Sequence, residues 1–254
     1  MIGFKTYKPY RYHFYRQNRH GNDNLEQQAQ ALFKSWFVDF EPFKGGKFVD
    51  SVLGLIPGGW RTLKLGEVCS CLLGGTPDRT NPDYWNGDIA WINSGEVNNF
   101  RVTKASEFIT QQGLNNSATK LLPKNTTILA ITGATLGQIS ILEIESCANQ
   151  SVVGVLENTD MKVEYIYPLI VHNIRSLIAS QTGGAQQHIN KQNVEELLVI
   201  VPSTEVLKDY TKTVKPIFNM ISKNCFEIMT LEKFRDTLLP KLMLGELKID
   251  KTNR

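Results

Sequence analysis

The longest helical pattern in the chain runs from about Thr204 to Leu238, directly after Pro202. At ~1.5 Å per residue such a helix is roughly 50 Å long, more than a small domain can cover. Its apolar positions alternate in steps of four and three residues, which is typical of a coiled-coil seam. We therefore expect a partner helix, or alternatively packing across the chain's own domain, and we expect Pro216 to bend or divide the helix. The seam residues are Ile217, Ile221, Asn224, Ile228, Leu231, Arg235 and Leu238.

The block from Trp60 to Pro202 alternates short β-branched runs with turns. Because strands mixed with irregularly spaced helices are typical of mixed α/β domains, we expect one here and not a doubly wound sheet. A helix is predicted from about Val163 to Ser180, where apolar residues recur on one face and Pro168 falls in the first turns. The predicted strands are Asp88–Val97, Thr126–Thr132, Gln138–Ser146, Ser151–Leu156 and Leu197–Val201.

The sequence pattern of the N-terminal part predicts much less regular secondary structure. Residues 1–20 contain four Tyr and five Lys or Arg without an acid or a readable period, so an irregular arm is expected over residues 1–22. A short helix is predicted from Asp23 or Asn24 to about Trp36, and Pro42 ends it. Glycines then form an open connector up to residue 56. The predicted segments are an arm (1–22), a truncated helix and linker (23–56), an α/β domain (57–203) and a long helix with its tail (204–254).

Charge is distributed unevenly along these segments. Residues 57–203 carry 10 Lys or Arg against 13 Asp or Glu, whereas the flanks 1–56 (8 against 5) and 204–254 (10 against 7) are each net +3. The sum is the chain's net charge of +3. A non-specific nucleic-acid binder would show a basic main domain. If the middle domain binds DNA, hydrogen bonding to base edges must therefore contribute.

Several other classes of protein and site are disfavoured. No apolar run approaches ~18 residues and no signal-peptide pattern opens the chain, so we expect no membrane span and a cytoplasmic location. Four cysteines without an export signal or zinc-type spacing predict free, buried thiols and no metal site. The motifs of hydrolase nucleophiles, phosphate-binding loops, zinc proteases and magnesium-dependent nucleases are missing from the sequence. We predict no catalytic residue.

Four glycine-containing loops of the middle domain carry side chains that both donate and accept hydrogen bonds. Such side chains read base edges in the major groove, and glycine lets a backbone approach DNA closely. The alternatives are a plain turn at 74–77 and, for Asn149 and Gln150, buried support of a loop. Trp60, Trp85 and Trp91 are predicted in the core or at its edge. The candidate DNA-binding residues are Thr76, Asp78, Arg79, Thr80, Asn93, Ser94, Thr132, Thr135, Gln138, Gln186, Gln187, His188 and Asn190.

A short internal repeat relates the two helical segments. Leu25-Glu26 and Leu231-Glu232 lie 206 residues apart, and at that offset Leu32 and Trp36 match Leu238 and Leu242. If the repeat is not chance, it indicates equivalent helix ends on either side of one domain.

A set of ordered motifs resembles type I restriction-modification specificity subunits over about residues 25–250. The segment 32–42 (LFKSWFVDFEP) resembles the end of their central helix, and 57–60 (PGGW) with 65–68 (LGEV) resembles the start of a target recognition domain. Later motifs are 74–77 (GGTP), 94–97 (SGEV), 183–190 (GGAQQHIN) and the pattern from Leu231 to Glu246. The family usually carries two recognition domains and two long helices, whereas this chain has one domain and a first helix that is predicted to be short.

The resemblance implies a non-catalytic subunit that reads double-stranded DNA. It implies a type I methyltransferase (modification) subunit and a restriction/translocase subunit as partners, which would hold S-adenosylmethionine, ATP and magnesium. The expected fold is a mixed α/β target recognition domain flanked by a short N-terminal helix and a long C-terminal coiled-coil-type helix. A homodimer would read a palindromic, bipartite site; the alternative is a non-functional or regulatory remnant that assembles no methyltransferase. The residues expected on dimer or partner helices are Leu32, Trp36, Ile217, Ile221, Asn224, Ile228, Leu231, Phe234 and Leu238.

Overall fold

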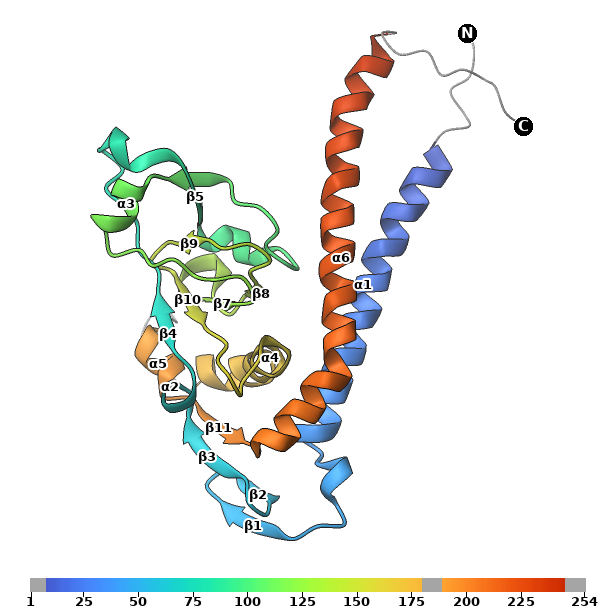
Figure 1. Cartoon of the computed structure of the whole chain (residues 1–254), viewed down its shortest axis with the longest axis vertical. Helices are drawn as coiled ribbons and strands as arrows, with labels where there is room; N and C mark the ends of the chain where they lie inside the picture. The colour runs from blue at the N-terminus through green and yellow to red at the C-terminus, as the bar shows by residue number, and fades with distance from the viewer. Residues whose placement is uncertain (1–7, 180–188, 245–254) are drawn as a thin grey trace.

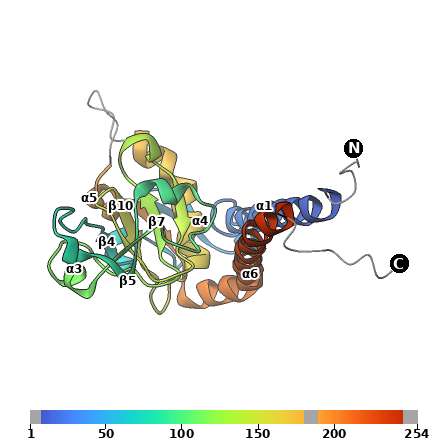
Figure 2. The same ribbon diagram turned by 90° about the horizontal axis from the view of Figure 1, so that it is seen from above.

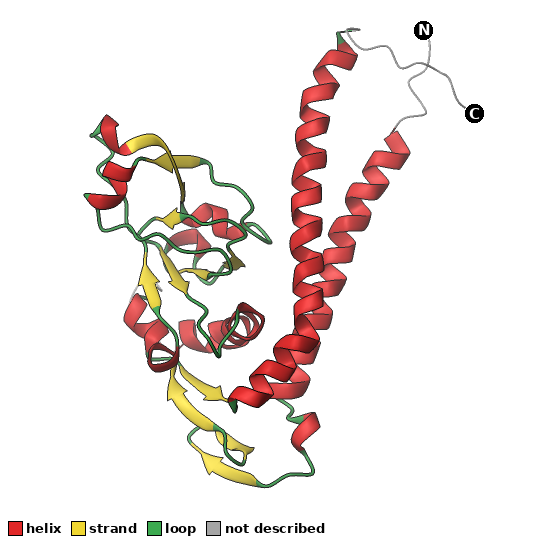
Figure 3. Cartoon of the chain, in the orientation of Figure 1, coloured by secondary structure: helices red, strands yellow, loops and turns green. Residues whose placement is uncertain are grey.

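The computed structural model describes residues 8–179 and 189–244. Two long helices run side by side, and an α/β domain lies against one stretch of the pair (Figures 1 and 2). Figure 3 shows that the strands lie in the α/β domain and in a hairpin below it, while the pair is helical throughout. The fold class expected from the sequence is confirmed.

The helix pair consists of α1 (Lys8–Phe37) and α6 (Thr204–Met243). They are antiparallel, because Trp36 near the end of α1 contacts Tyr210 near the start of α6, and Asn22 further up α1 bonds to Asn224. The predicted α6 is confirmed and reaches Met243, and Pro216 does not divide it. The helix that α6 packs along is α1 of the same chain.

The prediction of an irregular N-terminal arm is wrong for residues 8–22, which are helical, and residues 1–7 lie outside the described residues. Helix α1 has 30 residues and is much longer than the sequence pattern suggested. Once a helix is nucleated, each further residue adds one backbone hydrogen bond. Packing on α6 from Asn22 onward supplies that nucleus, and Pro9 falls in the first turn, where proline is tolerated.

The α/β domain is built on a four-stranded antiparallel sheet. The strand order is β4 (Cys71–Leu73), β10 (Val152–Val155), β7 (Thr127–Ala130) and β8 (Ile139–Ile141). Every residue of β7 and β10 is buried, because α4 (Val163–Ala179) covers one face and a second layer of structure covers the other. This covering explains why both strands read as continuous apolar runs.

The second layer contains a three-stranded sheet of order β6 (Glu107–Ile109), β5 (Trp85–Ile92) and β9 (Cys147–Ala148). The short helices around it are η2 (Pro82–Tyr84), η3 (Ser94–Asn98), α3 (Gln111–Asn115) and η4 (Gly133–Thr135). The remaining elements are η1 (Glu41–Phe43), the hairpin β1 (Phe48–Ser51) with β2 (Gly54–Pro57), the pair β3 (Arg61–Lys64) with β11 (Leu198–Val201), α2 (Leu65–Val68) and α5 (Lys191–Glu195).

Four of the five predicted strands contain an observed strand. The fifth, Asp88–Val97, is wrong in its second half, because the strand β5 ends at Ile92 and the Asn93 side chain caps η3. Helix α4 begins at Val163 as predicted and is described to Ala179. The elements without a sequence prediction are short or lie in the connector, including the hairpin β1–β2. One of these elements, β3, pairs with the distant strand β11 and has no local pattern. The hairpin β1–β2, in contrast, pairs locally within residues 48–57.

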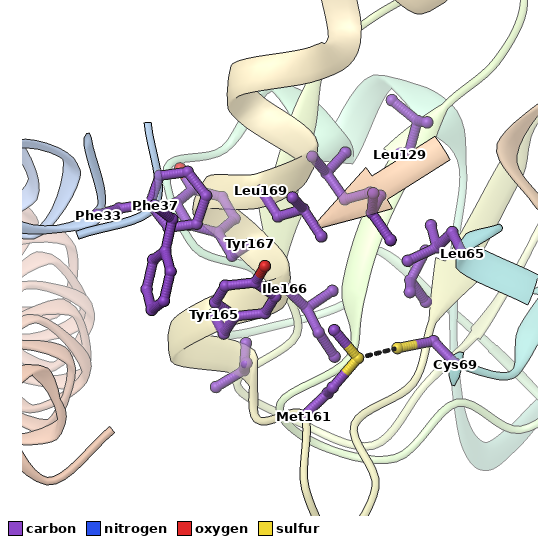
Figure 4. Close-up of a cluster of buried hydrophobic side chains, with 14 of the residues drawn as sticks. Phe33, Phe37, Leu65, Cys69, Leu129, Met161, Tyr165, Ile166, Tyr167 and Leu169 are labelled. Carbon is purple, nitrogen blue, oxygen red and sulfur yellow. Dashed lines mark hydrogen bonds between the residues drawn. The ribbon is translucent and has the colours of Figure 1, made fainter. Parts of the chain in front are cut away.

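An aromatic cluster joins the helix pair to the α/β domain. Phe37 is 4% exposed, and its ring centroid lies 4.8 Å from that of Tyr165 on α4 and 4.7 Å from that of Tyr210 on α6. Figure 4 shows Phe33 and Phe37 reaching from α1 toward Tyr165, with Cys69 and Met161 deeper in the domain. The end of α1 is therefore part of the main hydrophobic core.

The three tryptophans of the α/β domain lie in the core or at its edge, as predicted. Trp60 and Trp91 are buried and Trp85 is half-buried. The four cysteines are free thiols, of which Cys225 is only half-buried. Within the part of the chain that the structure describes, no helix is long and apolar enough to cross a membrane, and no cluster of metal-ligating side chains occurs.

Candidate nucleic-acid interface

Four predicted loops meet at one end of the four-stranded sheet. In an antiparallel sheet the end of one strand lies beside the start of its neighbour. Leu73 at the end of β4 pairs with Val153, near the start of β10, and Val152 at that start pairs with Ala130, which ends β7. The segments that follow β4 and β7 and those that precede β10 and β8 therefore lie at the same end of the sheet. We call these segments together the loop cluster; they are residues 74–80, 93–98, 131–138, 149–151 and 189–190.

The turn at 149–151 is the centre of the loop cluster. Backbone hydrogen bonds join it to the other segments: Gly75 N to Ala148 O (2.8 Å), Asn149 N to Ile92 O (3.0 Å) and Ile131 N to Ser151 O (2.9 Å). Ile189 N then bonds to Ile131 O (3.1 Å). Loops that are far apart in the sequence are thus held in fixed positions relative to one another.

Glycine is required where the first loop leaves the sheet. A Cβ atom on Gly74 would lie 2.2 Å from the carbonyl oxygen of Asn149, and one on Gly75 would lie 2.5 Å from the backbone nitrogen of Thr119. Both contacts are with backbone, which has little room to move. The two glycines therefore serve close packing of loops, and the reading of this segment as a plain turn is too simple.

The first loop places small polar side chains at the surface. Thr76 donates a hydrogen bond to Gln150 of the central turn. The exposed carboxylate of Asp78 accepts bonds from the backbone N–H and the hydroxyl of Thr80, and these bonds lower its pKa, the backbone bond most. Asp78 and Thr80 thus form a closed turn whose outer oxygen atoms face solvent.

Arg79 has its donors occupied by another side chain of the same chain. Its Nη2 atom donates to Glu107 Oε2 of β6 at 2.9 Å, and Nη1 donates to the other carboxylate oxygen. Its guanidinium also stacks on Trp85, 3.8 Å from the ring centroid. The ion pair raises the pKa of Arg79 and lowers that of Glu107, in each case chiefly through the hydrogen bonds. Two of the five N–H donors of the guanidinium are thus engaged, and its full fork is available to a base only if Arg79 leaves Glu107.

Asn93 and Ser94 shape the start of η3. The Asn93 side chain accepts a bond from Gly95 N at 2.8 Å, and Glu96 accepts from Asn93 N at 2.9 Å. Ser94 is half-buried. Asn93 therefore acts as a helix cap in this state, which satisfies backbone donors that a helix start leaves open.

The third loop contains Thr132, Thr135 and Gln138. Gly133 and Gly137 both adopt positive φ, which tightens the loop around η4. Thr135 donates to the backbone oxygen of Thr132 at 3.4 Å, whereas Gln138 is exposed. Gln138 is the one amide side chain among the three predicted residues of this loop.

The last loop is described only in part. Gln186, Gln187 and His188 lie outside the described residues. Asn190 caps α5, since its side chain accepts a bond from Asn193 N at 2.9 Å. Asn190 is nevertheless exposed.

Asn149 and Gln150, for which the sequence left loop support and DNA contact as alternatives, differ in their exposure. Asn149 is half-buried and accepts from Ser151 N at 3.1 Å, so it supports the turn. Gln150 is exposed beside Thr76. Sequence reasoning did not include Gln150 or Glu107 among the site residues. The Asn-Gln pair after β9 was a usable signal for Gln150, whereas nothing local marks Glu107 as the partner of Arg79.

The residues expected on partner helices fall into two groups. Leu32 and Trp36 of α1 and Ile217 of α6 pack on the main hydrophobic core. Ile221 is buried, and Asn224 bonds to Asn22. Further along α6, Ile228, Leu231 and Leu238 are half-buried and Phe234 is 56% exposed. The first group is therefore part of the chain's own core, and only the second offers apolar surface.

Comparison with known proteins identifies relatives of this chain. A family model described as the type I restriction modification DNA specificity domain matches residues 57–227. The MjaIX specificity subunit of a type I restriction enzyme from Methanocaldococcus jannaschii is 30% identical over 234 residues, covering 90% of this chain and 54% of that protein. The HindI specificity subunit from Haemophilus influenzae is 24% identical over 289 residues, covering 89% and 62%.

Solved structures of similar fold include two such subunits. The HsdS subunit from Thermoanaerobacter tengcongensis has a TM-score of 0.53 at 14% identity and matches 91% of this chain and 54% of its own. The S subunit of a type I restriction-modification system from M. genitalium has a TM-score of 0.57 at 16% identity, covering 91% and 55%. The chain spans about half the length of most of these relatives.

Proposed function

We infer a function from the premise that this chain belongs to the type I restriction-modification DNA specificity family. We propose that it reads a short half-site in double-stranded DNA and leaves the chemistry to other subunits. The observation that carries the proposal is the loop cluster: five segments with amide, hydroxyl and guanidinium side chains, held at one end of a buried sheet inside the matched domain.

The exposed side chains of the loop cluster suit base recognition. Amides such as Gln138 and Gln150 donate and accept together, which matches the edge of adenine, while the fork of Arg79 matches guanine. The domain's charge of 10 Lys or Arg against 13 Asp or Glu gives phosphate attraction a smaller part. We therefore expect the difference in affinity between target and non-target DNA sequences to be larger than for a non-specific DNA-binding protein.

The partners we propose are a type I methyltransferase (modification) subunit and a restriction/translocase subunit. S-adenosylmethionine, ATP and magnesium would be bound by those subunits and not by this chain. Support comes from the outer part of α6, which presents an apolar surface suited to another protein. Its exposed residues are Phe234, Leu239, Leu242 and Met243.

We propose a homodimer that pairs through Ile228, Leu231 and Leu238 on this outer part of α6, so that the other subunits would contact the residues that the dimer leaves exposed. A two-fold dimer would present two identical loop clusters, and so would read a palindromic, bipartite target. Leu32, Trp36 and Ile217 pack on the core of the chain and Ile221 is buried, so these residues are not part of the proposed dimer contact.

The test is to express the chain with a type I modification subunit and to map adenine methylation by single-molecule sequencing. A palindromic, bipartite motif is expected. An asymmetric motif would contradict the two-fold dimer, and no new methylation with both proteins soluble would contradict the proposed function. The alternative of a folded remnant is based on a short first helix and on the unusual residues 1–20. The length of α1, 30 residues, removes the first of these grounds, and the methylation experiment distinguishes the two functions.

A further inference from the structure

One guanidinium is buried where the α/β domain meets three helices. The side chain of Arg101 is 1% exposed, and Nη2 donates to Glu26 Oε2 of α1 at 2.9 Å. Its Cζ atom lies 4.7 Å from the ring centroid of Tyr167 on α4 and 5.8 Å from that of Phe218 on α6. A single side chain of the domain therefore contacts α1, α4 and α6.

A second polar contact reaches α6 from the neighbouring backbone. Val102 accepts a backbone bond from Glu143 N at 2.9 Å, so the segments that carry Arg101 and Glu143 are held together. Glu143 is buried and accepts a hydrogen bond from Ser222 Oγ of α6 at 2.6 Å. The domain thus bonds to α1 through Arg101 and to α6 through Glu143.

A third polar contact joins the two helices at the same level. Asn22 of α1 is buried, and its side-chain oxygen accepts a bond from Asn224 of α6 at 2.8 Å. Its Nδ2 atom donates to the sulfur of Cys225 at 3.6 Å. We call these three contacts together the polar junction, formed by Asn22, Glu26, Arg101, Glu143, Ser222 and Asn224.

We do not expect the polar junction to make the folded chain more stable than apolar residues of similar size would. Removing charges from water costs free energy that a buried pair recovers only in part, and well-packed apolar replacements are often as stable or more so. Hydrogen bonds, however, are directional, whereas apolar contacts tolerate sliding and rotation. A buried asparagine on a helix seam is known to select one register over others. The junction therefore favours a geometric role.

We propose that the residues of the polar junction are positioning residues, which set the angle between the α/β domain and the helix pair and the register of α1 against α6. The aromatic cluster around Phe37 is one attachment of the domain, and Glu26 lies eleven residues earlier on α1, about 16 Å away at ~1.5 Å per residue. Two separated attachments fix the angle between the domain and the helix pair, whereas the domain could rotate about a single attachment. This inference rests on the proposed function for its consequence, namely that the angle determines the spacing between the two halves of the DNA target.

The test replaces a polar pair by apolar residues of similar size. The variant combines Glu26→Leu with Arg101→Met, and the matched control combines Lys191→Met with Glu195→Leu, an ion pair of 2.7 Å that lies within α5. Distances are measured by electron spin resonance between labels at Asp88→Cys on β5 and Lys233→Cys on α6, both exposed. Protein without the two added cysteines reports any labelling of the native thiols.

We expect the variant to unfold at or near the wild-type temperature while its distance distribution becomes at least twice as wide, and the control to match wild type in both. An unchanged width in a folded variant overturns the proposal. If the variant does not fold, Asn22→Leu with Asn224→Leu is judged by the same criterion.

The DNA consequence has a separate readout. In the methylation assay the variant should modify targets with more than one spacer length, where wild type accepts a single length. If wild type methylates nothing, the proposed function has failed while the distance measurement still decides the geometric role. A widened distance distribution with an unchanged spacer would overturn the link from angle to spacing.

Discussion

Replacing Phe37 by alanine tests whether the end of α1 is part of the domain core. The ring is 4% exposed and lies edge-on to Tyr165 and Tyr210, with centroids 4.8 and 4.7 Å away. Removing a buried phenylalanine costs about 3–5 kcal/mol, and each lost aromatic pair adds about 0.5–1.5 kcal/mol beyond buried area. The packing on several sides leaves little scope for collapse, so we expect the upper part of that range.

The free energy of unfolding is measured by urea titration, followed by circular dichroism and tryptophan fluorescence. At about 2–4 °C per kcal/mol for a chain of this size, the melting temperature should fall by roughly 8–20 °C. The matched control is Phe234→Ala, the same change at a 56% exposed position of α6, for which we expect less than about 0.5 kcal/mol. Because Phe234 belongs to the surface proposed for other subunits, Phe108→Ala at a 42% exposed position of β6 serves as a second control. A loss at Phe37 as small as those at Phe108 and Phe234 would refute the argument that α1 belongs to the core.

Three further predictions concern the recognition surface and the core. Glu107→Gln should release Arg79 and tighten DNA binding by the assembled complex up to about fivefold, because an exposed ion pair contributes at most ~1 kcal/mol. Fluorescence anisotropy should show no such gain in affinity when Arg79 is also replaced by alanine. A gain that persists in that double variant would contradict the idea that Arg79 moves from Glu107 to DNA. Gln138→Ala should weaken binding to the mapped target about tenfold or more, whereas Gln28→Ala, an exposed glutamine on α1, should leave it unchanged; equal affinities would remove Gln138 from the site. Burial raises the pKa of the Cys71 thiol from 9.0 to about 12. The thiol's contribution to stability is therefore full below pH 9 and is lost as the pH rises toward 12. In urea titrations between pH 8 and 10.5, the free energy of unfolding of Cys71→Ala should fall less steeply above pH 9 than that of wild type, by about 1.4 kcal/mol per pH unit. Equal slopes would contradict that thiol's role.

Much of the fold is predictable because its signals are local. The four-three spacing from Ile217 to Leu238 predicts α6, and the apolar runs around Ile128 and Val153 predict the central strands β7 and β10. The loop positions are also predictable, since glycine and polar residues mark where strands end. Each of these features is decided by neighbours within a few residues.

The features that escaped prediction depend on distant partners. Residues 8–22 lack an amphipathic period, and they continue a helix that is supported by contacts such as Asn22 with Asn224, 202 residues away. Arg101 reads as an ordinary surface arginine, and only the fold brings Glu26 beside it. The same holds for Glu107, 28 residues from Arg79, because the pairing of β6 with β5 is what places it there.

The division of labour inside the loop cluster has a practical consequence for engineering new specificities. Gly74, Gly75 and Asn149 hold the loops to one another and tolerate little change. Gln138 and Gln150 instead present exposed side chains at the ends of strands whose own residues are buried. A combinatorial library that randomises these exposed positions and keeps the three anchors would vary the recognition surface while sparing the folding core. Under the proposed function, the domain would then act as a scaffold whose DNA-reading loops can be exchanged.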